Sequence, residues 1–293
     1  MRIPTIFLEK KKLPRVMFSI QVSPSSGAQE ISSLMRKIYE MGIWCFDLPY
    51  AKHLEAFKEL IILTEDRDLT GLAHLEAEEG ASLLGKPLHR FESIVLSTIR
   101  RNLSLPDSIR SLPPSFASEV FTQKEIDRIT FDPLRFDRGL ALFDPEETPF
   151  LLVGETYGDW LLALGRIDLL RVMVSRVREK GFLPIFSGQW TTFVLPKAKS
   201  LDVAAYAVPI NPKWSPSDLQ RAADLIKKFD KPVIVLNPLA DAKLLKEPEG
   251  VFSYLLGELK VYALIAKIAS EGDARRIIEA LKTFPSLIPP RKT

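Results

Sequence analysis

The sequence has few of the residues that mark disulfide-stabilised or multi-cysteine metal proteins. It contains one cysteine, Cys45, and three histidines, His53, His74 and His89. A single cysteine excludes an intramolecular disulfide framework and any zinc or iron–sulfur site built from several thiolates. The histidines show neither HxH nor HExxH spacing. We therefore assign no metal ligands.

An excess of one charge and a long apolar run are also missing. Lys+Arg number 40 against 37 Asp+Glu, and the two signs are interspersed, which argues against the concentrated basic face of a nucleic-acid-binding protein. No window approaches the roughly 20 apolar residues of a membrane helix, and the start, MRIPTIFLEKKKLPR, lacks the apolar core of a secretory signal. We expect a cytoplasmic protein with a small-molecule ligand and neither a nucleic-acid nor a membrane partner. Frequent proline and charge, with few asparagines and glutamines, favour a heat-adapted source.

What the sequence does contain is a repeated alternation of short apolar runs with helix-period stretches. The runs are nearly continuous in apolar residues, as in strands of a parallel sheet that helices cover on both faces. Eight such strands in 293 residues predict one (β/α)8 TIM barrel domain over 1–293. A doubly wound open sheet is the alternative, but the turn after the first strand, QVSPSSGAQE, has a single glycine. The predicted strands are 16–23, 43–49, 69–76, 149–155, 182–189, 202–211, 232–238 and 261–270.

Two segments add detail to this barrel. Residues 159–180 predict one long amphipathic helix that ends at Gly181. Between the third and fourth strands the chain is about twice as long as one repeat needs, so residues 104–148 are predicted to form an insertion with short helices of its own. The insertion is either a lid over the site or a packing extension.

Polar side chains stand where the predicted strands end, which is where barrels of this kind carry their active sites. Asp47, His74, Glu76 and Glu155 are able to do proton chemistry there. Two of them also have a structural interpretation: Asp47 as a helix cap and His74 as a hydrogen-bonded core residue. His74, Glu76 and Glu155 would also make a mixed nitrogen and oxygen set for a metal. The other strand-end residues are Gln21, Ser23, Tyr50, Tyr157, Ser187, Gln189, Asn211, Asn237, Lys267 and Ser270.

Three stretches resemble the aldo-keto reductase superfamily, which is also a (β/α)8 barrel. They are MGIWCFDLPYAKHLEAFKEL at 41–60, the run from REKGFLPIFSGQ to AVPIN at 178–211, and KPVIVLNPLADAKLL at 231–245. The resemblance implies a nicotinamide cofactor, such as NADP, and a catalytic tyrosine supported by an aspartate, a lysine and a histidine. His74, which alternates with Leu72 and is predicted to point into the barrel, is a catalytic candidate beside Asp47, Tyr50 and Glu155, whose catalytic positions are implied by the resemblance. The resemblance also assigns cofactor contacts to Ser187, Gln189, Asn211, Ser270, Arg275 and Arg276.

The sequence departs from that family at the catalytic positions. Tyr50 lies closer to Asp47 than the family pattern has its tyrosine, the third strand ends in LAHLE without a lysine, and Glu155 takes the place of the histidine. A tyrosine needs a nearby cation to lose its proton near neutral pH, and a neighbouring carboxylate opposes that ionisation. We therefore expect altered catalysis.

Three hypotheses remain. The first is a divergent NAD(P)-dependent oxidoreductase. The second is a cofactor-free or metal-assisted lyase or isomerase that uses Glu76 and Glu155 on a sugar-like or keto-acid substrate. The third is a binding protein without catalysis.

Overall fold

The computed structural model describes residues 3–21, 27–75, 80–102, 119–155, 157–216, 218–240 and 243–282. Eight parallel strands close into a barrel in the order β3, β4, β5, β9, β10, β11, β12, β13, and β13 pairs with β3. The predicted (β/α)8 barrel is confirmed, and the open sheet is excluded. The barrel strands are β3 (Val16–Ile20), β4 (Cys45–Leu48), β5 (Thr70–His74), β9 (Phe150–Val153), β10 (Leu183–Ser187), β11 (Ala205–Pro209), β12 (Val233–Leu236) and β13 (Ala263–Ile268).

The barrel strands read as continuous apolar runs because both of their faces are buried. Side chains of alternate residues point to opposite faces of a strand. On β4, Cys45 belongs to the cluster inside the barrel, while Phe46 belongs to the larger cluster between the barrel and its helices. On β10, Ile185 and Phe186 divide in the same way. This alternation decides which strand-end residues point into the mouth of the barrel.

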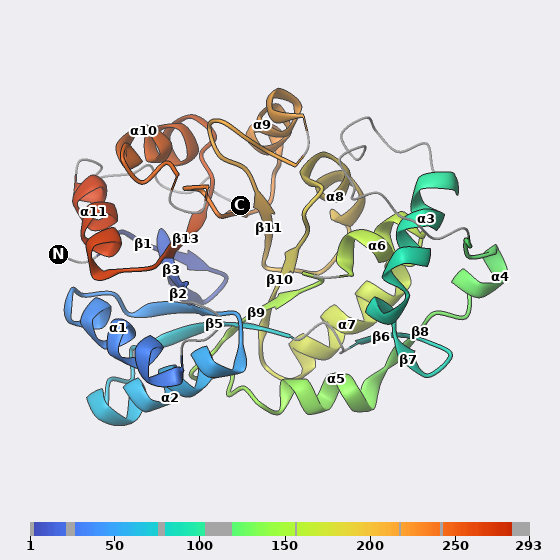
Figure 1. Ribbon diagram of the computed structural model, residues 1–293, viewed down its shortest axis with the longest axis horizontal. Coiled ribbons are helices and arrows are strands. Elements are labelled where there is room, and N and C mark those ends of the chain that lie inside the picture. Colours follow the sequence, from blue (N-terminus) through green and yellow to red (C-terminus); the bar gives the residue numbers. More distant parts are fainter. Residues whose placement is uncertain are drawn as a thin grey trace.

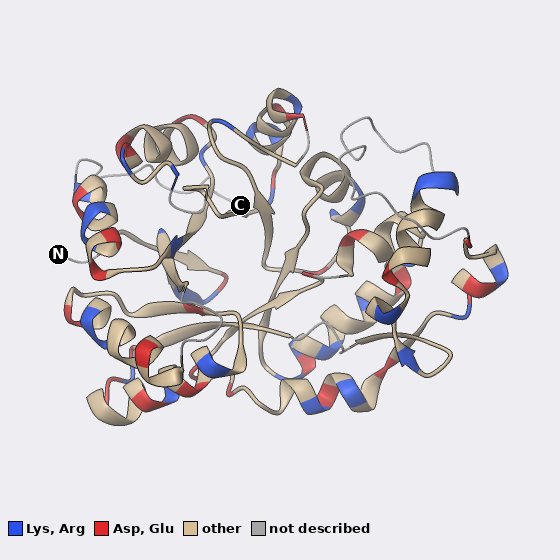
Figure 2. Cartoon of the chain, in the orientation of Figure 1, with Lys and Arg blue, Asp and Glu red and all other residues tan. Residues whose placement is uncertain are grey.

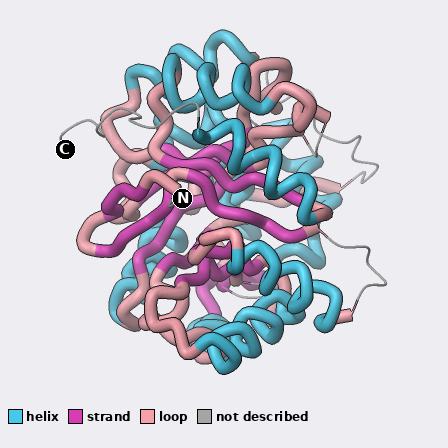
Figure 3. The backbone as a smooth tube through the Cα atoms, turned by 90° about the vertical axis from the view of Figure 1, so that its left-hand side faces the viewer, coloured by secondary structure: helices cyan, strands magenta, loops and turns pink. Residues whose placement is uncertain are grey.

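Helices surround the strands, as the tube view in Figure 3 shows. Among the described residues, none of the helices is long and apolar enough to cross a membrane. Positively and negatively charged residues share the same helices, for example α2 (Ala51–Thr64), α5 (Pro133–Leu140) and α11 (Glu271–Lys282), as the colours of Figure 2 show. The helices outside the insertion are α1 (Ala28–Glu40), α2 (Ala51–Thr64), α6 (Gly158–Ala163), α7 (Ile167–Glu179), α8 (Thr191–Ala198), α9 (Leu219–Lys228), α10 (Pro248–Phe252), a π-helical turn (Ser253–Glu258) and α11 (Glu271–Lys282).

The long helix predicted over 159–180 is divided in two. Gly165 has a φ of 75°, a left-handed conformation that separates α6 from α7. The predicted end at Gly181 is correct, with a φ of 90°. The amphipathic pattern continues through the break, because both helices pack their apolar faces on the same core.

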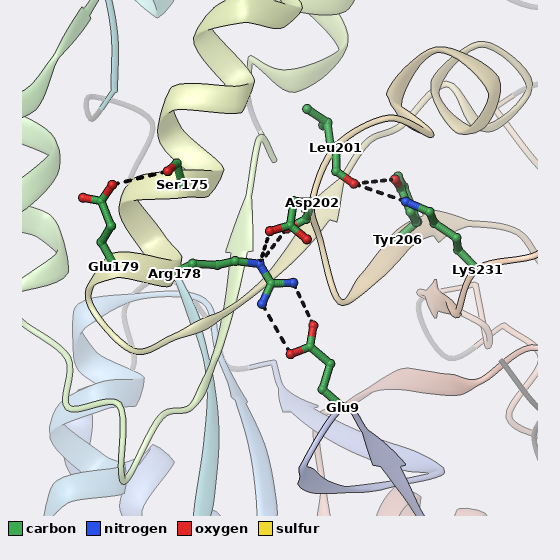
Figure 4. Close-up of polar contacts among 8 residues, drawn as sticks. All are labelled: Glu9, Ser175, Arg178, Glu179, Leu201, Asp202, Tyr206 and Lys231. Atoms are coloured by element: carbon green, nitrogen blue, oxygen red, sulfur yellow. Dashed lines mark hydrogen bonds and ion pairs between the residues drawn. The ribbon is translucent and has the colours of Figure 1, made fainter.

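An antiparallel hairpin, β1 (Thr5–Leu8) and β2 (Lys11–Pro14), precedes the barrel and covers the amino-terminal ends of its strands. Its side chains Ile6, Leu8 and Leu13 join the cluster inside the barrel. Arg178 at the end of α7 holds the hairpin turn, because its guanidinium lies 2.7 Å from the Glu9 carboxylate (Figure 4). The sequence analysis did not predict this hairpin.

Between β5 and β9 the chain leaves the barrel and forms a small subdomain, which lies at the right of Figure 1. A three-stranded antiparallel sheet in the order β7-β6-β8 anchors it. Residues 103–118, which include the start of the predicted insertion at 104–148, lie outside the described residues. The elements are β6 (Gly80–Leu83), β7 (Lys86–Pro87), a 3-10 turn (Leu88–Phe91), α3 (Glu92–Asn102), α4 (Gln123–Ile126), β8 (Thr130–Asp132) and α5 (Pro133–Leu140).

Candidate functional site

A cavity of about 770 Å³ opens at the carboxyl ends of the barrel strands. Inner-face residues make its floor, because Ser19, Asp47, His74 and Lys267 each follow an apolar inner residue by two positions on their strands. In the strand register, Lys267 of β13 is paired with Ser19 of β3, and Ser19 is paired with Asp47 of β4, so the three residues lie side by side on neighbouring strands. The remaining lining residues are Ile20, Gln21, Pro49, Tyr50, Lys52, His53, Glu155, Gln189, Pro209, Trp214, Leu236, Asn237 and Ile265.

His74 lies between two carboxylates. Its Nε2 is 2.5 Å from Oδ1 of Asp47, and its Nδ1 is 2.7 Å from Oε2 of Glu155. The side chains of His74 and Asp47 are 7% and 5% exposed, whereas that of Glu155 is 44% exposed. The three residues therefore form a chain that runs from the buried Asp47 to the accessible Glu155.

The two carboxylates keep His74 protonated. Burial alone would lower the pKa of His74, but the charge and hydrogen bond of Asp47 and the hydrogen bond of Glu155 outweigh it and raise the pKa to about 10. His74 is thus an imidazolium at neutral pH and donates a hydrogen bond from each ring nitrogen. The third strand ends without the lysine that the resemblance implies. In the structure, His74 is the cation at this point.

Gly154 sets the position of Glu155. Its φ of 89° turns the chain at the end of β9, and an added Cβ would lie 2.8 Å from the Phe186 ring. A residue with a side chain would therefore strain this turn and collide with Phe186. The glycine allows the strand to end abruptly and Glu155 to reach His74.

Tyr50 stands apart from this chain of three. It precedes α2, is 65% exposed at the rim of the cavity and stacks at a tilt against His53, with 5.6 Å between the ring centroids. His53 itself is buried and donates from Nε2 to the carbonyl oxygen of Ile20 at 2.9 Å. Burial lowers the pKa of His53, so this ring is neutral and mainly anchors α2 to β3.

The residues expected to bind a cofactor are dispersed. Gln189 lines the cavity. Ser187 is buried inside the barrel, and its hydroxyl has no hydrogen-bond partner among the residues that the structure describes. Asn211 is buried and accepts a hydrogen bond from the backbone N–H of Lys213, so it holds its own turn.

The amino-terminal end of α11, expected to bind the cofactor phosphate, is already capped from within. The Ser270 hydroxyl accepts from the N–H of Asp273, and the Asp273 carboxylate accepts from the N–H groups of Ala269 and Ser270. Arg275 pairs with Glu271 at 2.6 Å, and Arg276 is exposed on the same helix. A carboxylate on these amides opposes the binding of a second anion there.

The other strand-end residues divide between the cavity and its surroundings. Gln21, Asn237 and Lys267 line the cavity, whereas Tyr157 is buried in the cluster outside the barrel. Ser23 and Glu76 lie outside the described residues. Across the described part of the chain, no group of three His, Cys, Asp or Glu side chains is arranged to hold a metal ion.

Sequence reasoning missed Asp159, which supports the loop that carries Gln189. Asp159 is buried in the first turn of α6, and its carboxylate accepts from the N–H groups of Gln189 at 2.7 Å and Trp190 at 3.1 Å. Burial raises the pKa of Asp159 to about 6, against the opposing effect of those two hydrogen bonds. An acid between the apolar side chains of YGDWLLAL was a signal that could have identified it.

Lys52 and Trp214 at the rim were also missed. Lys52 is the second residue of α2, and Trp214 belongs to a tight turn closed by hydrogen bonds with Asn211. Lys52 lies in the first turn of a helix and Trp214 in a loop, and at such positions the periodicity of the sequence does not predict where a side chain points.

Comparison with known proteins finds likeness in structure alone. No protein-family model and no curated protein matches the sequence. A putative aldo-keto reductase from Pseudomonas aeruginosa is 13% identical with a TM-score of 0.53, over 96% of this chain and 94% of that one. An aldo-keto reductase from Bacillus halodurans in its holo form is 12% identical with a TM-score of 0.54, over 99% and 93%.

A thermostable aldo-keto reductase in complex with the inhibitor epalrestat gives a TM-score of 0.57 at 11% identity, over 96% of this chain and 94% of that one. At this level of identity the comparison shows the fold. The chain therefore has the (β/α)8 barrel of the aldo-keto reductases.

Proposed function

We propose that the protein is a barrel enzyme that transfers a proton to or from a small, oxygen-rich substrate, with Glu155 as the acid–base residue. The observation that carries this proposal is the chain Asp47–His74–Glu155, whose accessible end lines the cavity at the carboxyl ends of the barrel strands. Functional sites are where buried charges with strongly shifted pKa values collect.

The three residues divide the work. Glu155, as a carboxylate, takes a proton from a substrate C–H or O–H group and returns it to another position on the substrate. The His74 imidazolium donates to Glu155 Oε2 and stabilises the carboxylate before it takes the proton and after it has returned it. Asp47 holds His74 in place from its other nitrogen and keeps it protonated. Only Glu155 needs to touch the substrate.

A nicotinamide-dependent oxidoreductase is the second candidate, and the fold shared with an aldo-keto reductase in its holo form favours it. The residues at the expected cofactor positions do not fit the group well. Of those six, Gln189 lines the cavity, while Ser270 and Asn211 hold local structure. We therefore assign no hydride step. The hypothesis of a lyase or isomerase that uses Glu76 and Glu155 is kept with Glu155 as its acid–base residue, since Glu76 lies outside the described residues.

Exchange of substrate hydrogen for solvent deuterium tests the proposal without knowledge of the product. The protein is incubated in D2O with a panel of hydroxy acids, keto acids and sugars, with and without NADPH, and exchange is followed by proton NMR. Glu155→Gln should slow exchange by about 10²–10⁴-fold, the usual contribution of a general acid or base. Glu55→Gln, an exposed carboxylate on α2, is the matched control and should leave the rate unchanged.

The outcomes separate the candidates. Exchange that persists in Glu155→Gln would remove the role of this residue. Turnover that requires NADPH would favour the oxidoreductase, and tight binding of a panel compound without exchange would favour a binding protein.

A further inference from the structure

We infer that the wall of the cavity opposite Glu155 recognises an anionic group of the substrate, a carboxylate or a phosphate, with Lys267 as its principal contact. This inference rests on the proposed acid–base function and adds the class of substrate. The reacting part of the molecule would lie at Glu155 and its anionic end at Lys267.

Barrel topology places these two residues on opposite sides. Glu155 directly follows the turn that ends β9, and Lys267 lies on β13. In the closed order of eight strands, β13 is the fourth strand from β9 in either direction. Lys267 and Glu155 therefore face each other across the mouth, and a substrate that lies across the cavity meets both.

Lys267 points inward for the same reason as the apolar residues before it. Ile265 and Ala263, two and four positions before it on β13, belong to the cluster inside the barrel. Register with Ser19 puts Lys267 in the uppermost inner layer, where it is half-buried and lines the cavity. A long cationic side chain at the top of this layer extends toward the mouth.

Amide side chains stand on both sides of Lys267. Gln21 follows β3, and its backbone N–H donates to the Ile268 carbonyl oxygen at 2.7 Å, which fixes it beside β13. Asn237 follows β12 with a φ of 49°, a left-handed conformation that asparagine tolerates better than most residues. Both line the cavity. A cation flanked by two amides is a suitable donor set for an oxyanion.

The charges of the whole cavity lining favour the same occupant. Among the described lining residues, Lys52, His74 and Lys267 are cationic and Asp47 and Glu155 are anionic, a net charge of +1. Both carboxylates contact His74 directly. A singly charged anion would neutralise the lining, and it would be repelled least on the side of Lys267, which lies opposite Glu155.

Binding of matched acids, alcohols and phosphates tests this inference. Two series are used, glycerate, glycerol and glycerol 3-phosphate, and gluconate, sorbitol and sorbitol 6-phosphate, with affinity measured by calorimetry. In at least one series an anion should bind at least about tenfold more tightly than its alcohol, and Lys267→Met should remove that difference. Preference for the acid identifies a carboxylate as the natural group, and preference for the phosphate identifies a phosphate.

Controls separate charge from folding and from catalysis. Lys267→Arg keeps the charge and should retain most of the preference, which Lys267→Met loses. Lys10→Met, on the exposed hairpin turn at the other end of the barrel, should bind like the wild type. Glu155→Gln should still prefer the anion while losing proton exchange, so the proposed function can fail while the anion site stands. Anions that bind no better than their alcohols, or as tightly to Lys267→Met as to the wild type, would overturn the inference.

Discussion

At the scale of single residues, the site depends on the two hydrogen bonds that join His74 to the carboxylates of Asp47 and Glu155. Asp47, His74 and Glu155 were each found in the sequence at the end of a strand, because an ionisable residue that closes an apolar run is conspicuous. Their mutual contacts could not be predicted, because they depend on the register of three strands and on the turn at Gly154. For the same reason, the role of His74 as the cation of the site could not be predicted from the sequence.

Replacement of His74 should test this arrangement through stability. His74→Gln leaves the buried Asp47 carboxylate without its cation, and we expect a loss of about 3–5 kcal/mol at pH 6–7 in urea unfolding. The pKa of His74 is about 10 in the folded protein against an ordinary 6.5. Its stabilisation is therefore complete below pH 6.5 and declines as the pH rises through 10. The difference between wild type and variant should narrow over that interval, and a constant difference would contradict the assignment.

At the scale of elements, apolar periodicity identified strands and helices but not the connections between them. The pattern over 159–180 continues through Gly165, since α6 and α7 both pack on the same core, so the break could not be located. The loops that complete the cavity are held by single polar contacts, such as those of Asp159, and these leave almost no periodic signal.

Asp159 should prove necessary for the loop between β10 and α8. Asp159→Ala leaves the N–H groups of Gln189 and Trp190 without an acceptor, and we expect a loss of about 2–4 kcal/mol. Asp159→Asn retains an acceptor oxygen and should cost clearly less. Urea unfolding at pH 7, followed by the fluorescence of the four tryptophans of the chain, measures both losses. Equal losses in the two variants would mean that the negative charge, rather than the acceptor, holds the loop.

At the scale of the whole molecule, eight buried strands were predictable because each is apolar on both faces. The hairpin at 5–14 was not, since its two strands have only four residues each and expose Thr5 and Phe7 on the first and Lys11 and Lys12 on the second. A run such as EKKKLP is also typical of a surface turn. Its contribution lies in tertiary packing, where Ile6, Leu8 and Leu13 complete the interior of the barrel.

Truncation of one hairpin side chain should therefore weaken the entire barrel. Leu13 is 0% exposed, and we expect Leu13→Ala to reduce the free energy of unfolding by about 2–5 kcal/mol in a single cooperative transition. Phe7, on the same hairpin, is 57% exposed, and Phe7→Ala should change it by less than about 0.5 kcal/mol. A separate early transition in Leu13→Ala would show that the hairpin unfolds independently of the barrel.

The hairpin also has a consequence for the entry of substrate and the exit of product. Because it closes the amino-terminal end of the barrel, substrate can reach Glu155, and product can leave it, only through the open end. Product that remains there prevents the next substrate from binding, so product and substrate should compete for the same free protein.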